Sequence, residues 1–276
     1  MTGMLSIILA ANGLRDYGVC SFEAVSDKLL NCLAKGRLPE DAKSVITVLF
    51  PYKVPGTGGG NLARYAAVPD YHEIAGHMLT TCSDALKKAF PEYEFVWFID
   101  NSPIPEVYAA ALSGLGVVGD NKLLINKRYG SYCFIGTIVT TLEIPSTGNS
   151  IEYCNHCGKC IKACRGGALQ ADGGFDRTRC LSDISQRKGV LSPDEIALLK
   201  QNGLVWGCDT CQDVCPLNVD ALNTYIKPFL DRSNPNVTID DLATANDRAY
   251  LFRGRGVVER NIRALEGDDD NGGQFQ

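Results

Sequence analysis

Histidine is scarce in this sequence, with 3 residues among 276. No apolar run reaches the roughly 18 residues of a membrane-spanning helix, so we expect no membrane partner. The first residues show neither a basic segment nor a small-residue cleavage site, which predicts a cytoplasmic chain with reduced thiols. No Gly-Lys-Ser/Thr follows the glycine-rich stretch 53–63, which excludes a phosphate-binding loop there. The net charge of −5 disfavours a general nucleic-acid surface, although a local basic patch is compatible with it.

Cysteine, in contrast, is abundant, with 12 residues in the chain. Eight are concentrated in one segment: Cys154, Cys157, Cys160, Cys164, Cys180, Cys208, Cys211 and Cys215. The first four have the spacing C-x2-C-x2-C-x3-C, and the last three have C-x2-C-x3-C followed by proline. In two-cluster ferredoxins, the fourth cysteine of such a run ligates the other cluster. The spacing therefore predicts two [4Fe–4S] clusters.

The same rule assigns each ligand. Cluster 1 takes Cys154, Cys157, Cys160 and Cys215. Cluster 2 takes Cys164, Cys208 and Cys211, with Cys180 as the fourth ligand. The alternatives are zinc, which favours separate C-x2-C pairs with a long spacer, and a disulfide framework, which needs an oxidising compartment. Four cysteines within eleven residues favour the clusters over both.

Strand and helix patterns alternate before the cysteine-rich segment. Apolar runs predict strands over 44–52, 94–100, 123–126 and 133–144, and helical spacing predicts helices over 22–35, over 71–90 and after Pro103. This alternation indicates an α/β (α+β) domain over residues 1–150.

The rest of the chain predicts two further parts. Residues 151–220 should form a bacterial ferredoxin-like double-cluster domain, held together largely by its metal sites. Within it, Ser192-Pro193-Asp194-Glu195 predicts a capped helix that ends at Gly203. Residues 221–276 should form a helical extension with a disordered tail over 267–276.

Three separate segments carry a family resemblance. They are GCDTCQDVCP at 207–216, FIDNSP at 98–103 and GLGVVGDNKLLI at 114–125. In this order they resemble the epoxyqueuosine reductases, cobalamin-dependent iron–sulfur enzymes of queuosine-tRNA synthesis. The chain departs from the family at three positions: Val107 replaces an arginine, Asp120 a lysine and Arg165 a proline.

The resemblance implies a chemistry. Electrons would arrive singly from a ferredoxin or flavodoxin and reach cob(II)alamin. The cobalamin would be base-off, and the sequence holds no Asp-x-His-x-x-Gly motif that would supply a histidine ligand to the cobalt. Asp100 would be the proton donor, at the end of an apolar strand where α/β sheets open onto a site. The corrinoid contacts would include Asn121, Leu124, Ser182 and Asp209.

Several alternatives stay open. By position alone Asp100 is better explained as a helix N-cap. The family motif favours the functional role instead, in which burial beside Trp97 and Phe98 would raise its pKa. Tyr71 and His72 either face the pocket or lie on a helix surface, and His156 is expected at the surface or beside the ligands.

Partner and activity also stay open. The family carries a C-terminal helical-repeat domain that helps to grip tRNA, and residues 250–267 would supply one helix of it, so tRNA is an uncertain partner. The chain is either a reductase of epoxyqueuosine or a related small compound, or an electron-transfer protein that reduces a corrinoid or a partner. The complete α/β half favours the reductase.

Overall fold

The computed structural model describes residues 2–267. The chain divides into two units, the first comprising the residues up to Pro51 and Tyr71–His156, the second Tyr52–Asp70 and the chain from Cys157 onward. The glycine-rich segment belongs to the second unit, where the Leu62 N–H donates to Pro235 O (3.0 Å) and the Ala63 N–H to Trp206 O (2.8 Å). None of the helices in the described part of the chain combines the length and the apolar composition that a membrane span requires.

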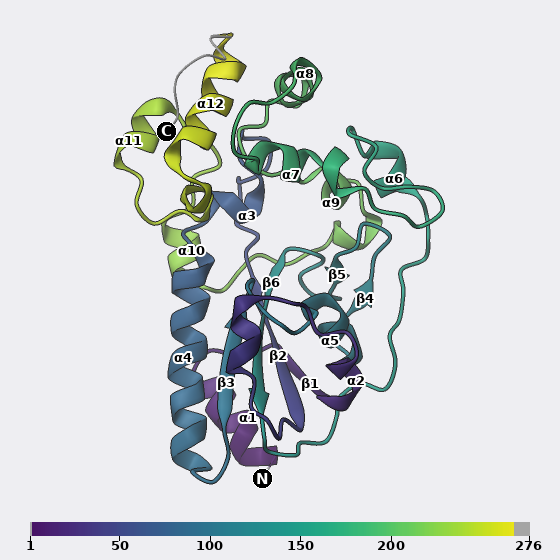
Figure 1. The fold of residues 1–276 in the computed structure, drawn as a ribbon, viewed down its shortest axis with the longest axis vertical. Coiled ribbons are helices and arrows are strands. Elements are labelled where there is room, and N and C mark those ends of the chain that lie inside the picture. The colour runs from purple at the N-terminus through teal and green to yellow at the C-terminus, as the bar shows by residue number, and fades with distance from the viewer. Residues whose placement is uncertain (1, 268–276) are drawn as a thin grey trace. The chain divides into compact units, whose positions relative to one another are not determined.

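A four-stranded sheet in the order β1-β2-β6-β3 forms the centre of the first unit (Figure 1). The strands are β1 (Tyr17–Ser21), β2 (Ser44–Pro51), β3 (Phe95–Ile99) and β6 (Cys133–Thr140). All pairings are antiparallel, and β2 is buried along its whole length, which explains its continuous apolar run. The mixed helix–strand class is confirmed. The rule that strand ends open onto a site applies to parallel sheets, so it does not support the role of Asp100 in this antiparallel sheet.

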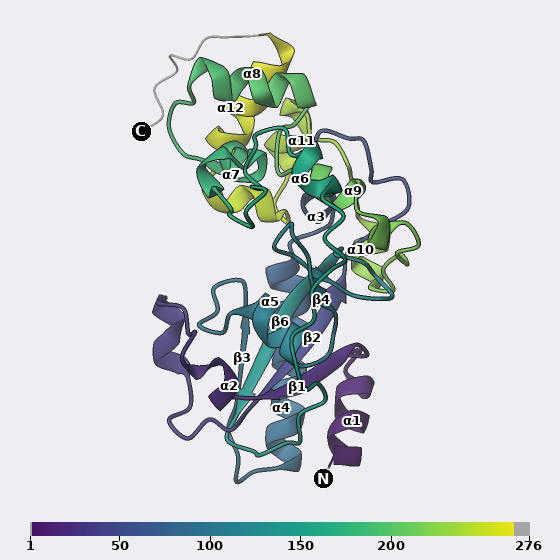
Figure 2. The same cartoon turned by 90° about the vertical axis from the view of Figure 1, so that its right-hand side faces the viewer.

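Helices cover both faces of this sheet (Figure 2). On one face α4 (Tyr71–Ala89) packs on β3 and β6, with α1 (Thr2–Ala11) against α4. On the other face α5 (Glu106–Leu112) packs on β1, β2 and β6. A two-stranded ribbon of β4 (Val117–Val118) and β5 (Leu124–Ile125) contacts α5.

The helix expected over 22–35 is wrong for most of its length. Only α2 (Glu23–Ser26) and the 3-10 helix η1 (Leu33–Arg37) form there. The chain between them leaves the helical path, because the Leu30 N–H donates to Pro103 O (2.8 Å) instead of a helical carbonyl. The tertiary contact therefore outweighs the local helical spacing.

The second unit consists of short helices. They are α3 (Arg64–Ala67), α6 (Lys159–Ala163), η2 (Arg177–Arg179), α7 (Leu181–Gln186), α8 (Pro193–Asn202), α9 (Thr210–Asp213), η3 (Pro216–Asn218), α10 (Lys227–Asp231), α11 (Ile239–Thr244), η4 (Ala249–Arg253) and α12 (Arg255–Glu266). The capping box at Ser192 and the left-handed Gly203 confirm the prediction for α8. Of the tail expected to be disordered, 268–276 lies outside the described residues.

An apolar core also stabilises the second unit. Trp206, Tyr250 and Val258 are buried together, with residues from the glycine-rich segment and from α11 and α12. Burying such side chains contributes about 1.5–3 kcal/mol each. The expectation that metal sites largely hold the cysteine-rich segment together did not include this core, which residues far apart in sequence supply.

Candidate active site and cluster ligands

Asp100 lies in a tight turn directly after β3. Its φ of 59° is left-handed, which non-glycine residues rarely adopt. The Asp100 N–H donates to Glu106 Oε1 (3.0 Å), and the Asp100 carbonyl accepts from the Ser102 N–H (2.8 Å). One carboxyl oxygen, Oδ2, lies 3.3 Å from His72 Nε2. The turn thus directs the carboxyl group toward the start of α4.

Two expectations about Asp100 do not hold. Its side chain is 59% exposed, so the expected burial beside Trp97 and Phe98 is wrong. The strand ends at Ile99, and the turn carries the carboxyl group away from the core. The helix-cap alternative also fails, because α5 starts at Glu106 with Pro105 as its N-cap.

Tyr71 and His72 begin α4 beside this turn. The rings of Tyr71 and His72 stack with centroids 4.0 Å apart, and Tyr71 stacks on Phe134 of β6 at 4.0 Å. Stacking of this kind restricts the ring positions. The imidazole that contacts Asp100 is therefore supported by an aromatic column on the sheet.

Glu106 is a site residue that sequence reasoning missed. Burial, and after it the nearby Asp100 carboxylate, raises the pKa of the Glu106 carboxyl to about 8, although the Asp100 N–H and His72 act in the opposite direction. In the sequence, an acid at the first position of a helix after proline is ordinary. The only sequence signal for a role of Glu106 is its position six residues after Asp100, close enough for a turn to bring the two together.

Glu106 also lines a pocket of about 410 Å³ in the first unit. The lining residues are Pro105, Glu106, Val107, Tyr108, Val118, Ile151 and Tyr153. Most of this lining is apolar, and it includes Val107, where the resemblance led us to expect arginine. The pocket therefore presents one carboxyl group among apolar and aromatic side chains.

Asn121 and Leu124, the expected corrinoid contacts of the first unit, differ in their surroundings. Asn121 is 7% exposed, and within the described residues its Nδ2 has no hydrogen-bond partner. An unsatisfied buried donor is costly and typically points to a missing acceptor. The Leu124 side chain instead packs in a core cluster with Leu49 and Ala110.

The four thiols predicted for cluster 2 lie together in the second unit. Burial, and then the charge of Cys208, Cys180 and Cys164, raises the pKa of the Cys211 thiol to about 12. Such electrostatic coupling requires short separations. Iron ions bind thiolates and would displace the protons of these thiols on binding, so the arrangement fits a cluster.

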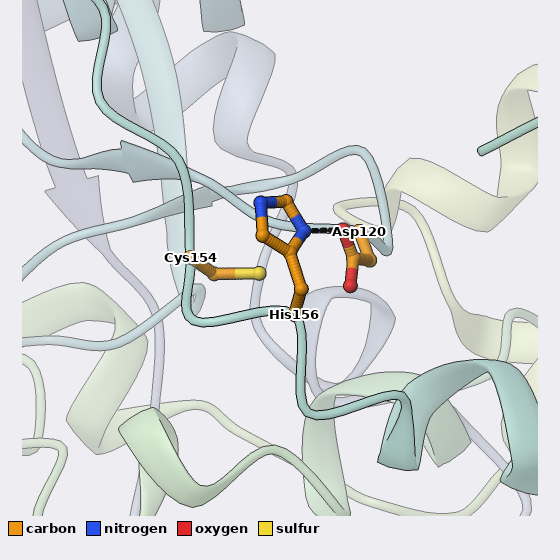
Figure 3. Close-up of side chains that lie close together, drawn as sticks. All are labelled: Asp120, Cys154 and His156. Atoms are coloured by element: carbon orange, nitrogen blue, oxygen red, sulfur yellow. Dashed lines mark hydrogen bonds and ion pairs between the residues drawn. The ribbon is translucent and has the colours of Figure 1, made fainter.

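For the four predicted ligands of cluster 1, the structure gives less evidence of proximity than for those of cluster 2. Cys160 lies in α6, which packs against α9, and Cys215 follows α9 by two residues. Cys154 is in the first unit, where its sulfur, a His156 nitrogen and an Asp120 oxygen lie within 4.8 Å of one another (Figure 3). Asp120 Oδ1 is 2.7 Å from His156 Nδ1. The His156 side chain is exposed, and its contact with Asp120 orients the imidazole.

Ser182 and Asp209 are engaged by other protein groups. Asp209 Oδ2 accepts from the Arg64 backbone N–H (2.7 Å) and its Oδ1 from Gln212 Nε2 (2.9 Å). The Ser182 hydroxyl accepts from Gln186 Nε2 (3.2 Å). Both residues therefore have a structural role next to Cys180 and Cys208.

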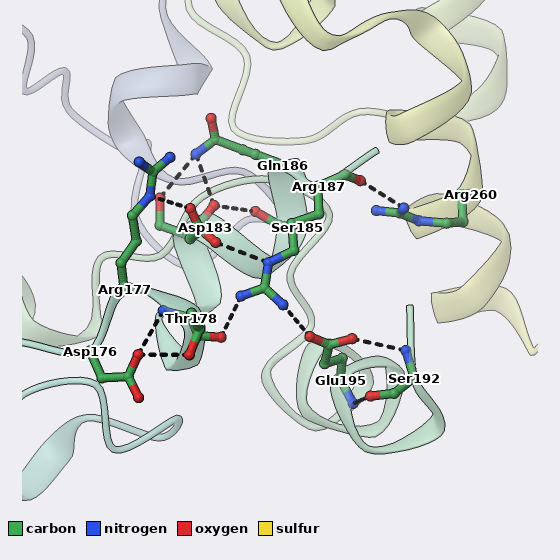
Figure 4. Close-up of polar contacts among 11 residues, drawn as sticks. Asp176, Arg177, Thr178, Asp183, Ser185, Gln186, Arg187, Ser192, Glu195 and Arg260 are labelled. Atoms are coloured by element: carbon green, nitrogen blue, oxygen red, sulfur yellow. Dashed lines mark hydrogen bonds and ion pairs between the residues drawn. The ribbon is translucent and has the colours of Figure 1, made fainter. Parts of the chain in front are cut away.

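Charged groups brace the segment that carries Cys180 (Figure 4). Arg187 donates to Asp183 (2.9 Å), to Glu195 and to the Thr178 carbonyl, and Arg260 of α12 donates to the Arg187 carbonyl (2.8 Å). Although burial alone would raise it, hydrogen bonds from Arg177 and Arg187 hold the pKa of Asp183 below its ordinary value. This network links η2 and α7, on either side of Cys180, to α8 and α12.

Two family models match the chain. Residues 153–218 match the "4Fe-4S double cluster binding domain", and residues 35–101 match "Epoxyqueuosine reductase QueG, DUF1730". Among curated proteins, the epoxyqueuosine reductase of Gloeobacter violaceus is 33% identical over 233 residues, covering 80% of this chain and 72% of that protein. That of Lactococcus garvieae is 30% identical over 244 residues, covering 81% and 68%.

Solved structures share the fold. An epoxyqueuosine reductase from Streptococcus thermophilus superposes with a TM-score of 0.78 at 23% identity, covering 96% of this chain and 80% of that one. The Bacillus subtilis enzyme, with its catalytic aspartate loop swung out of the active site, gives 0.81 at 21% identity, covering 98% and 82%. A third, with an epoxyqueuosine-modified tyrosine tRNA stem loop, gives 0.80 at 20% identity, covering 98% and 82%.

The fold and the double-cluster domain define an iron–sulfur oxidoreductase. This chain belongs to the epoxyqueuosine reductase family. The expected family is therefore confirmed, together with the double-cluster domain.

Proposed function

We propose that this chain reduces epoxyqueuosine to queuosine in RNA, with Asp100 as the proton donor. The Asp100 turn carries the proposal: an exposed carboxyl group is held beside His72 by a backbone with a φ of 59°. Strained residues of this kind concentrate at functional sites. The activity named for the curated relatives, and the tRNA stem loop in one related structure, support the substrate.

The reaction removes one oxygen atom. Both C–O bonds of the epoxide break and a C=C bond forms. The reaction takes up two electrons and two protons, and the oxygen leaves as water. A one-electron donor of the ferredoxin or flavodoxin class supplies the electrons. The Asp100 carboxyl gives a proton to the oxygen as a C–O bond breaks, and His72 Nε2, 3.3 Å away, returns a proton to Asp100.

Two [4Fe–4S] clusters would carry the electrons, with the ligand sets that the spacing predicts. The four coupled thiols of the second unit support Cys164, Cys180, Cys208 and Cys211 for cluster 2. Cluster 1 would take Cys154, Cys157, Cys160 and Cys215, where the support is the spacing alone.

We also infer that the chain binds base-off cob(II)alamin. The amide side chains of a corrinoid offer carbonyl acceptors, and the unpartnered buried Asn121 Nδ2 is a donor that fits one of them. When bound, low-valent cobalt supplies a reductant and nucleophile that side chains cannot provide. Leu124, Ser182 and Asp209 stay predicted contacts with weaker support.

Anaerobic turnover of an epoxyqueuosine stem loop tests the role of Asp100. Wild type and Asp100→Asn are compared with Asp84→Asn, a change at an exposed acid on α4. We expect Asp100→Asn to lose turnover by about 10²-fold or more, with iron and corrinoid content unchanged, and Asp84→Asn to match wild type. Full activity of Asp100→Asn would disprove the assignment.

Comparing free nucleoside, stem loop and whole tRNA defines the substrate. We expect the stem loop to suffice, because a related structure holds one. Strong preference for whole tRNA would contradict this. Reduction of added corrinoid without turnover of any of the three would instead support the electron-transfer alternative.

A further inference from the structure

Glu106 links the turn after β3 to the start of α5 by a hydrogen bond, in addition to the apolar cluster that Phe98 and Ala109 share. It is the first residue of α5, and its Oε1 accepts the Asp100 N–H at 3.0 Å. The Asp100 N–H lies beyond the sheet, because the last paired residues of β3 are Ile99 and its partner Gly136. Glu106 therefore supplies an acceptor that the sheet does not provide.

This hydrogen bond stabilises a conformation with an intrinsic cost. A left-handed backbone is unfavourable for an L-residue, so compensating contacts help Asp100 to keep a φ of 59°. The Glu106 carboxyl holds the N–H of the turn, and the Ser102 N–H holds its carbonyl. The direction of the Asp100 side chain follows from this backbone conformation.

The electrostatics of the pair are consistent with close packing of two acids. The pKa of Glu106 is raised to about 8, first by burial and then by Asp100, so near neutrality Glu106 carries a proton and the two carboxyl groups do not repel each other. His72 faces the pair from α4, and the phenols of Tyr108 and Tyr153 line the same pocket as Glu106. A neutral carboxyl still offers its carbonyl oxygen to the Asp100 N–H.

We propose that Glu106 is a positioning residue, whose carboxyl oxygen holds the Asp100 N–H and thereby directs the Asp100 carboxyl toward His72. The inference rests on the proposed function, in which Asp100 donates the proton. It extends that function to a residue that acts through the backbone of Asp100 and needs no contact with the substrate.

Two substitutions separate the hydrogen bond from the side-chain volume. Glu106→Gln keeps a carbonyl acceptor of the same reach, whereas Glu106→Leu removes it. Glu92→Gln and Glu92→Leu, at an exposed acid, are the matched controls. We expect Glu106→Leu to lower kcat by on the order of 10²-fold with little change in KM, and Glu106→Gln to restore most of it. Iron and corrinoid content should stay constant.

A second measurement needs no substrate. The chain has 3 histidines, so histidine labelled with ¹⁵N gives three ring systems, and His72→Gln identifies the one that contacts Asp100. Glu106→Leu should move the His72 ring signals to their positions in Asp100→Asn, and Glu106→Gln should leave them at the wild-type positions. These two His72 signal comparisons can be made even if the wild type fails to reduce epoxyqueuosine. Failure of the proposed function can therefore be distinguished from failure of the positioning role of Glu106.

Three results would overturn the inference. One is a Glu106→Leu protein with wild-type kcat and wild-type His72 signals. Another is a Glu106→Leu protein that loses turnover while the His72 signals stay unchanged, because then the loss does not pass through the position of Asp100. A Glu106→Gln protein as inactive as Glu106→Leu would also contradict it, since the acceptor is retained.

Discussion

The backbone N–H of Asp100 donates to the Glu106 carboxyl at 3.0 Å, so the residue after β3 is tied to the first residue of α5. The same turn leaves the Asp100 carboxyl exposed and 3.3 Å from His72. The half-buried Glu106 orients the turn, whereas the exposed Asp100 carboxyl stays accessible. A proton donor needs both orientation and access.

Stability should depend on pH through Glu106. The pKa of its carboxyl is raised to about 8 in the folded chain, against about 4.3 when unfolded. Between these values the folded state binds more protons, so stability is fully present below the lower pKa and is lost as pH rises toward the higher one. Glu106→Gln should flatten the fall in urea midpoint across this window. An unchanged slope, equal to that of Glu92→Gln, would contradict the prediction.

Cys180 should be required for one cluster only. Its thiol is coupled to those of Cys208 and Cys211, the other predicted ligands of cluster 2. Cys180→Ala should therefore fall from about eight to about four irons per chain after anaerobic reconstitution, whereas Cys32→Ala should keep all of them. Full iron content in Cys180→Ala would remove it from the ligand set.

Gly166 should be intolerant of a side chain. A Cβ there would lie 1.9 Å from the Arg179 carbonyl oxygen, and Arg179 Nε donates to the Gly166 carbonyl at 2.9 Å. The contact connects the segments that bear Cys164 and Cys180. Gly166→Ala should destabilise the chain by about 1–3 kcal/mol and reduce iron content, while Gly36→Ala, with open space around its Cβ, should not. Thermal unfolding with iron analysis decides between these outcomes.

Asn121 should contribute to corrinoid affinity. Its buried Nδ2 lacks a partner in the described part of the chain, and a corrinoid amide would supply one. Asn121→Leu removes the donor while keeping similar volume, and should weaken cob(II)alamin binding by roughly 10-fold. Equilibrium titration followed by visible absorption measures this. Equal affinity of wild type and Asn121→Leu would exclude the contact.

The parts predictable from sequence were those with strong local or chemical signals. The buried strand over 44–52, the helix from Tyr71 and the capped helix at Ser192 each match the structure closely. Cysteine spacing predicted a double-cluster domain because a cluster needs four thiolates at restricted separations. Such signals depend on few residues that are close in sequence.

The rest depended on contacts between distant segments. The Leu30–Pro103 hydrogen bond interrupts a helix that spacing alone favoured. The glycine-rich segment at 53–63 supplies Leu62 to a core with Trp206, which no local pattern shows. Glu106 looks like an ordinary first residue of a helix, and only the turn at Asp100 shows which group it holds.

Mass analysis of the product from an epoxyqueuosine stem loop tests the central claim most directly. Chain with both clusters and cob(II)alamin is incubated anaerobically with a one-electron reductant, and the digested nucleosides are separated and weighed. The account predicts queuosine, lighter by one oxygen atom, from the wild type and almost none from Asp100→Asn. Unchanged epoxyqueuosine with the fully loaded wild type would contradict it.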